Sequence, residues 1–78
     1  MEKQGPRVLI VDDEESIQQT LGAVLPPAGY TVYQVRNGKE ALRTVQTIRP
    51  DLILLDLGLP DMDGKEVIRH LREEWRCV

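Results

Sequence analysis

Two short apolar runs that each end in acidic residues constrain this chain most strongly. Residues 8–11 are followed at once by Asp12 and Asp13, and residues 52–55 are followed by Asp56. Uninterrupted apolar runs of this length, closed by polar residues, are typical of strands buried on both faces of a parallel sheet. Ligands of such sheets bind outside the carboxyl ends of the strands. We therefore expect the three aspartates to lie together at one edge of the sheet.

A cluster of three carboxylates indicates a site for a cation or for a reaction. The charges repel one another, so the arrangement is costly unless a divalent cation or a reaction uses it. Asp12 and Asp13 are candidate Mg²⁺ ligands, because Mg²⁺ prefers oxygen donors and keeps several of its waters. Residues 12–15 also supply the acids favoured at the start of a helix. The two interpretations are compatible, because a cap at that helix end faces the same crevice.

The rest of the chain alternates between strand and helix patterns. A helical stripe follows the first strand, and Pro26 and Pro27 predict that this helix stops or kinks near Leu25. Asn37 and Gly38 indicate a turn before the second helix. Three strand–helix units in succession predict an α/β fold with a parallel sheet. The expected strands are residues 7–12, 30–35 and 52–57. The expected helical stripes are Ile17, Leu21, Val24, Leu25 and Ala28, then Ala41, Leu42, Val45 and Ile48, then Val67, Ile68 and Leu71, with Trp75 as a candidate for the end of the third stripe.

Length, charge and cysteine content narrow the functional classes. With 78 residues the chain is at most one small domain, and its net charge of −3 argues against nucleic-acid binding by this segment. No apolar stretch approaches the length of a membrane span, and the N-terminal residues lack the apolar core of a signal peptide. The single cysteine, Cys77, excludes an internal disulfide and is expected to be an accessible thiol. We therefore expect a cytoplasmic protein without membrane contact.

Four sequence motifs together form a highly specific pattern. They are Val8-Leu9-Ile10-Val11-Asp12-Asp13-Glu14, Asn37-Gly38-Lys39-Glu40-Ala41-Leu42, Pro50-Asp51-Leu52-Ile53-Leu54-Leu55-Asp56-Leu57 and Leu59-Pro60-Asp61-Met62-Asp63-Gly64. With these motifs the chain resembles the receiver domain of bacterial two-component response regulators, and the resemblance covers nearly the whole chain up to about Glu73. The sequence is most similar to regulators of the winged-helix transcription-factor class, and within that class to the regulators of potassium-uptake (Kdp) operons.

The resemblance implies a role for each candidate site residue. Asp56 matches the family's phosphoacceptor, which attacks a phosphoryl group and becomes an aspartyl phosphate. Asp12, Asp13 and Asp56, together with the backbone carbonyl of Gly58, match the family's Mg²⁺ ligands. The expected chemistry is therefore Mg²⁺-dependent phosphoryl uptake on Asp56.

The resemblance also implies a fold, a partner and a cellular role. It implies the flavodoxin-like receiver fold with parallel strands in the order 2-1-3, in which Pro60 and Gly64 shape the loop after Asp56. The phosphoryl donor would be a sensor histidine kinase, so the chain would be a signalling module and not an enzyme in the usual sense. His70, the single histidine, falls on the polar side of the third helix and is expected to be an exposed or half-exposed surface residue. The phosphoryl donor of the family is a histidine on the partner kinase and not one in the receiver.

A complete receiver has five strand–helix units, so residues 1–78 are expected to form a partial receiver domain that lacks the last two units and the output domain. Two hypotheses follow. In the first, the chain is a phosphoacceptor module of a transcriptional regulator. In the second, it is a truncated, non-signalling fragment that keeps the acidic pocket but cannot phosphorylate or switch efficiently. The third strand would then be an exposed edge that favours self-association, and DNA binding would belong to the absent output domain.

Three other kinds of site fit the sequence poorly. A calcium loop built on Gly64 would place Leu59 and His70 where Asp and Glu are required. A haloacid-dehalogenase phosphatase is disfavoured, because that family's pattern has a second aspartate where this chain has Gly58. A dinucleotide cradle is disfavoured, because the first strand–helix turn is acidic and not glycine-rich.

Overall fold

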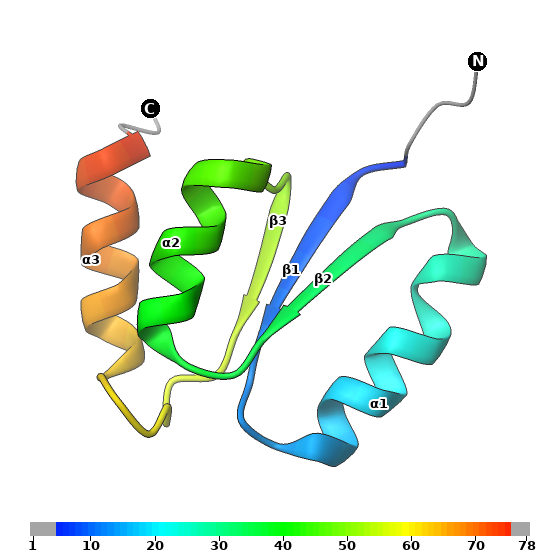
Figure 1. Ribbon diagram of the computed structural model, residues 1–78, viewed down its shortest axis with the longest axis horizontal. Helices are drawn as coiled ribbons and strands as arrows, with labels where there is room; N and C mark the ends of the chain where they lie inside the picture. Colours follow the sequence, from blue (N-terminus) through cyan, green and yellow to red (C-terminus); the bar gives the residue numbers. More distant parts are fainter. Residues whose placement is uncertain (1–4, 76–78) are drawn as a thin grey trace.

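The computed structural model describes residues 5–75, which form a three-stranded parallel sheet with helices on both faces (Figure 1). The strand order is β2-β1-β3, which confirms the predicted α/β fold and strand order. In chain order, the elements are β1 (Arg7–Val11), α1 (Glu15–Val24), the 3₁₀ turn η1 (Pro26–Ala28), β2 (Thr31–Val35), α2 (Gly38–Ile48), β3 (Leu52–Leu55) and α3 (Gly64–Trp75).

β1 forms the centre of the sheet, and its carboxyl end is level with those of both neighbours. Val11 pairs with Val35 of β2 and with Leu55 of β3. The next residues after β1 and β3 are Asp12 and Asp56. Both aspartates therefore leave the sheet at the same edge, where ligands of parallel sheets bind.

The central strand is buried from both sides. α1 covers one face of the sheet, whereas α2 and α3 lie next to each other on the opposite face (Figure 1). Residues 8–11 are each 1% exposed or less, which confirms the first apolar run as a strand buried on both faces. The larger core lies under α2 and α3 and comprises Leu9, Val11, Val35, Ala41, Val45, Leu59 and Val67.

β3 is shorter and more exposed than its apolar sequence predicts. It ends at Leu55 and not at Leu57, and Leu52 is 50% exposed. β3 has β1 on one side and no further strand among residues 5–75 on the other. Its side chains are only partly covered for this reason. The run is therefore not buried on both faces, and within residues 5–75 it has the edge position that we expected for the third strand of a partial receiver domain.

α1 buries a different side chain from the ones that its apolar stripe predicts. Gln18 is 3% exposed, whereas Ile17 and Val24 are 36% and 58% exposed. The buried side of α1 lies over the ends of β1 and β2, where backbone carbonyls accept hydrogen bonds from Gln18. The predicted inward stripe is therefore only partly correct.

The ends of the elements follow local backbone chemistry. α1 stops at Val24 as predicted, and the two prolines form η1, which Gly29 closes at a φ of 104°. This φ lies in the left-handed region that favours glycine. Asn37 is more than a turn residue, because its side chain caps α2 by accepting a hydrogen bond from the backbone N–H of Glu40 at 2.9 Å.

Three smaller expectations concern the membrane, the histidine and the cysteine. Within residues 5–75, no helix combines the length and the apolar character that a membrane crossing requires. His70 on α3 is half-buried, which is compatible with the expected position at the surface. Cys77 and the side chain of Trp75 lie outside the part of the chain that is described.

Candidate functional site

The structure brings Asp12, Asp13 and Asp56 together at the carboxyl edge of the sheet, as the sequence predicts. One carboxylate oxygen of each residue lies within 4.8 Å of the others. Asp12 and Asp56 are half-buried, whereas Asp13 is exposed. The cluster is therefore open to solvent on one side and supported by the sheet on the other.

Backbone hydrogen bonds hold two of these aspartates in register. The N–H of Asp56 donates to the carbonyl of Val11 at 2.9 Å, and the N–H of Asp12 donates to the carbonyl of Val35 at 3.2 Å. Each side chain is tied as well. Asp12 Oδ1 accepts the N–H of Glu14 at 2.9 Å, and Asp56 Oδ1 accepts the N–H of Gly58 at 3.1 Å. One oxygen of each carboxylate is thus oriented by its own loop.

Within residues 5–75, no basic side chain forms an ion pair with any of the three aspartates. Among the described residues the two ion pairs are Arg36 with Glu15 and Arg69 with Glu66, and neither involves the cluster. Three carboxylates in reach of one another, without a nearby cationic partner, match the oxygen donor set that a hard divalent cation requires. The donor chemistry of the site therefore fits Mg²⁺.

The loop after β3 is closed tightly between Leu57 and Gly64. The N–H of Gly64 donates to the carbonyl of Leu57 at 3.1 Å. A Cβ atom at Gly64 would lie 2.6 Å from Leu57 Cα, so the close approach requires glycine. Leu59 is buried in the core and anchors the middle of the loop, whereas Pro60 is exposed.

Asp61 is a structural residue of the site that the sequence interpretation missed. Its carboxylate accepts the backbone N–H groups of Gly38 at 2.7 Å and Lys39 at 2.9 Å. These hydrogen bonds, above all that from Gly38, lower the pKa of Asp61 below its ordinary value. The neighbouring Met62 lies directly against Gly38. The sequence held one indication of this contact: Asp61 is an acidic loop residue, and Gly38 begins a helix whose free N–H groups can bind a carboxylate.

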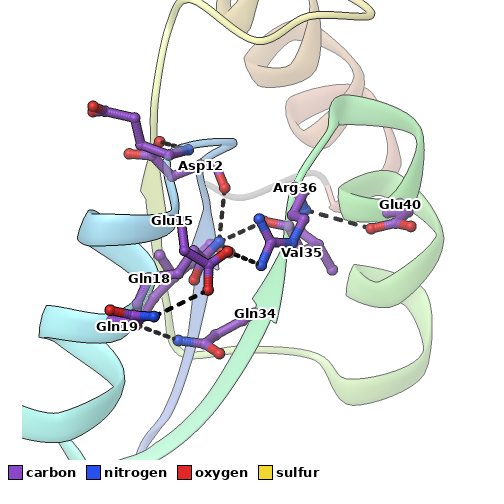
Figure 2. Close-up of polar contacts among 10 residues, drawn as sticks. Asp12, Glu15, Gln18, Gln19, Gln34, Val35, Arg36 and Glu40 are labelled. Atoms are coloured by element: carbon purple, nitrogen blue, oxygen red, sulfur yellow. Dashed lines mark hydrogen bonds and ion pairs between the residues drawn. The ribbon is translucent and has the colours of Figure 1, made fainter.

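Gln18 is the second residue that the sequence interpretation missed. Figure 2 shows its carboxamide between the ends of β1 and β2, next to Asp12 and Val35. In the sequence Gln18 is followed by the polar residues Gln19 and Thr20, so the apolar stripe of this helix gave little reason to expect that Gln18 is buried. Its burial places a hydrogen-bond donor directly beneath the acidic cluster.

The acids after β1 divide between two tasks. Glu14 is the N-cap residue of α1, but its side chain makes no cap hydrogen bond. Glu15 in the first turn pairs instead with Arg36, which follows β2 (Figure 2). The hydrogen bond and charge of Arg36 lower the pKa of Glu15. This exposed pair links the start of α1 to the residue after β2, whereas Asp12 and Asp13 belong to the cluster.

The family follows from this architecture and from sequence comparison. A model of the response regulator receiver domain matches residues 8–78. The chain therefore belongs to the response regulator receiver domain family. Receiver domains of this family are signalling modules with an acidic pocket, and the structure of this chain has a cluster of three acidic residues at the carboxyl edge of its sheet.

The chain resembles two transcriptional regulators in particular. It is 47% identical over 68 residues to the alkaline phosphatase synthesis transcriptional regulatory protein PhoP of Bacillus subtilis, an alignment that covers 87% of this chain and 28% of PhoP. It is 46% identical over 71 residues to the KDP operon transcriptional regulatory protein KdpE of Escherichia coli, covering 91% of this chain and 31% of KdpE. The chain thus spans less than a third of either relative. The second likeness confirms the resemblance to Kdp-operon regulators.

Solved structures confirm the flavodoxin-like receiver fold. The chemotaxis response regulator CheY4 of Vibrio cholerae superposes with a TM-score of 0.88 and 38% identity, covering 92% of this chain and 60% of that one. A chain from the complex of histidine kinase ThkA with response regulator protein TrrA gives a TM-score of 0.82 and 36% identity, with coverages of 88% and 60%.

Proposed function

We propose that this chain is the phosphoacceptor part of a transcriptional response regulator. In this role Asp56 takes a phosphoryl group, and Mg²⁺ is held by Asp12, Asp13 and Asp56 with the carbonyl of Gly58. The observation that supports this most strongly is the cluster itself, whose three carboxylates reach within 4.8 Å of one another. Such a concentration of negative charge is unfavourable without a cation, and its place at the strand ends is where parallel sheets bind ligands.

The proposed reaction is an in-line displacement at phosphorus. A carboxylate oxygen of Asp56 attacks the phosphorus atom of a phosphohistidine, and a new P–O bond forms as the P–N bond to imidazole breaks. The imidazole nitrogen leaves with the bonding electron pair and takes up a proton from solvent. The bound cation would offset charge on the phosphoryl oxygens. The chain itself positions the attacking carboxylate through two hydrogen bonds. The N–H of Gly58 donates to Asp56 Oδ1, and the N–H of Asp56 donates to the carbonyl of Val11 at the end of β1.

The partner we propose is a sensor histidine kinase. Support comes from the family and from the solved complex of a histidine kinase with a response regulator, one chain of which shares this fold. We further propose a cytoplasmic signalling role without enzymatic turnover of a separate substrate. With a net charge of −3 and no basic run, this segment is not expected to contact nucleic acid. DNA binding would belong to a separate output domain of such a regulator.

A second candidate function concerns residues 1–78 as an isolated chain. One observation favours it: β3 lies at the sheet edge of the described residues, and Leu52 is 50% exposed there. An unpaired, uncharged strand edge recruits other chains. The isolated chain would then self-associate and signal inefficiently. Sedimentation of this chain and of a Leu52→Lys variant tests the idea, since a charged edge should favour the monomer, whereas a concentration-independent monomer in the original chain would contradict it.

Phosphoryl uptake from a small phosphodonor tests the first proposal. The protein is incubated with acetyl phosphate, with Mg²⁺ or with EDTA, and its intact mass is measured over time. One phosphoryl group should be added in Mg²⁺, and none in EDTA or in an Asp56→Asn variant. Uptake that is equally fast in EDTA would contradict the role of the cation. Uptake by the Asp56→Asn variant would contradict the assignment of the phosphoacceptor.

A further inference from the structure

We propose that Gln18 is a positioning residue of the acidic cluster, which fixes the peptide that joins Asp12 to Asp13 and so sets the Mg²⁺ affinity of the site. This inference rests on the proposed Mg²⁺ site. It concerns a residue on α1 that lies under the cluster and is not itself a candidate ligand.

The contacts of the Gln18 side chain are the first observation. Its Nε2 atom lies 2.8 Å from the carbonyl oxygen of Asp12 and 2.8 Å from that of Val35, with the carbonyl of Ile10 at 3.5 Å. All three neighbours are carbonyl oxygens, which only accept hydrogen bonds, so the nitrogen of the carboxamide must face them. The side chain is therefore a donor aimed at the ends of β1 and β2 (Figure 2).

The energetic cost of this arrangement is the second observation. Gln18 is the buried polar residue of the described core, at 3% exposure, and its Oε1 atom has no hydrogen-bond partner among the described residues. A buried polar atom without a hydrogen-bond partner lowers the stability of the fold. An apolar side chain of similar shape would fill the same space without this cost. A glutamine at this position donates hydrogen bonds to the carbonyls of Asp12 and Val35, which an apolar residue could not do.

The consequence for the cluster follows from covalent geometry. The carbonyl of Asp12 belongs to the same planar peptide as the N–H of Asp13, so a bond to this oxygen fixes the plane from which both residues extend. On its other side, Asp12 donates its own N–H to Val35 at 3.2 Å. The backbone of Asp12 is thus held on both sides. The side chains of Asp12 and Asp13 therefore extend from a fixed backbone, next to Asp56, which follows the adjacent strand β3.

A purely structural role for Gln18 makes a different prediction, and Gln34 offers the matched control. Gln34 Nε2 donates to the backbone carbonyl of Gln18 at 2.7 Å. This bond ties the same helix to the same strand, β2, without touching Asp12. If Gln18 only fastened α1 to the sheet, loss of either carboxamide would have the same effect on the site. If Gln18 positions the peptide at Asp12, only its own loss should weaken metal binding.

The test measures Mg²⁺ affinity and stability separately for Gln18→Met and Gln34→Met in the full chain. Calorimetric titration gives the affinity, and urea unfolding in EDTA gives the stability without the metal. Removing a group that orients a metal ligand typically weakens binding about 10- to 100-fold. We expect a loss in this range for Gln18→Met and unchanged affinity for Gln34→Met. We also expect a displaced amide resonance of Asp13 in the metal-free Gln18→Met spectrum.

A second variant covers the case in which Gln18→Met does not fold. Gln18→Asn keeps a carboxamide but is one methylene shorter, so it cannot reach both carbonyls and should also weaken Mg²⁺ binding. Equal affinity in the original chain and a folded Gln18 variant would overturn the inference, as would equal weakening by Gln34→Met. Failure of both Gln18 variants to fold in EDTA would also overturn it, because the role would then be structural. Absence of Mg²⁺ binding in the unsubstituted chain would instead contradict the proposed function.

Discussion

Asp61 and Gly38, which are 23 positions apart in the sequence, are joined by a hydrogen bond of 2.7 Å from the Gly38 N–H to the Asp61 carboxylate. The second carboxylate oxygen accepts the N–H of Lys39 at 2.9 Å. These are N–H groups at the start of α2, which no helical carbonyl satisfies, and the positive end of the helix dipole favours the negative charge. The loop that follows the proposed phosphoacceptor is thereby fastened to α2.

This contact predicts a pH-dependent contribution to stability. The hydrogen bonds from Gly38 and Lys39 lower the pKa of Asp61, so the folded state favours the charged carboxylate. The contribution is therefore present above the ordinary aspartate pKa of about 3.9. It is lost as the pH falls through the lower pKa of the folded state. Urea unfolding of the chain and of Asp61→Asn should show a stability difference at neutral pH that shrinks in acid. A difference that stays constant with pH would contradict this role.

The close approach of Gly64 to Leu57 predicts that two glycine-to-alanine substitutions in this loop differ in their effect on stability. Gly64→Ala places a Cβ 2.6 Å from Leu57 Cα, whereas a Cβ at Gly58 meets nothing nearer than Asp56 Oδ1 at 3.8 Å. Overpacking of this kind typically costs about 1–3 kcal/mol. We expect Gly64→Ala to lose stability in this range and to shift the loop next to Asp56. Gly58→Ala, which keeps the backbone carbonyl, should resemble the original chain in urea unfolding. Equal stability of both variants would argue against the close approach.

The cap of α2 predicts a smaller and more local effect. Asn37 accepts the N–H of Glu40 at 2.9 Å, and removal of such a cap typically costs about 1 kcal/mol. Asn37→Ala should lower the free energy of unfolding by this amount. Asn37→Ser keeps a capping oxygen and should stay close to the original value. If the serine and alanine variants lose the same stability in denaturant titrations, the side-chain cap contributes nothing measurable.

The proposed ligand role of Asp13 predicts loss of Mg²⁺ binding in Asp13→Ala. The matched control is Glu14→Ala, which removes the same charge from the next residue, whose carboxylate is not part of the cluster. General electrostatic attraction would make the two variants equally weak. Direct ligation should abolish binding only in Asp13→Ala. Magnesium titration followed by amide chemical shifts distinguishes these cases, and unchanged affinity in Asp13→Ala would contradict the site assignment.

Sequence patterns predicted the elements that depend on local repetition, and missed features that depend on three-dimensional neighbours. The run at residues 8–11 has apolar side chains on both faces, which predicts a central strand, and these residues are buried in the structure. The run at residues 52–55 has the same character, but its burial depends on strands outside its own segment, and Leu52 remains half exposed.

The candidate site was likewise predictable only where it depends on the ends of strands. Asp12, Asp13 and Asp56 follow strands, and the topology of a parallel sheet brings strand ends together without further information. Gln18 and Asp61 form hydrogen bonds with backbone groups of other elements, Gln18 to Val35 and Asp61 from Gly38, which no side-chain pattern in the sequence reveals. Such contacts become visible only when the strand register and the loop path are known.

The location of the phosphoryl group tests the central claim most directly. An aspartyl phosphate is reduced by borohydride to homoserine, which peptide mass spectrometry identifies by position. After incubation of the protein with a phosphodonor and Mg²⁺, the account predicts homoserine at position 56 and at no other position. Homoserine at position 12 or 13, or a phosphoryl group retained on His70, would contradict the account.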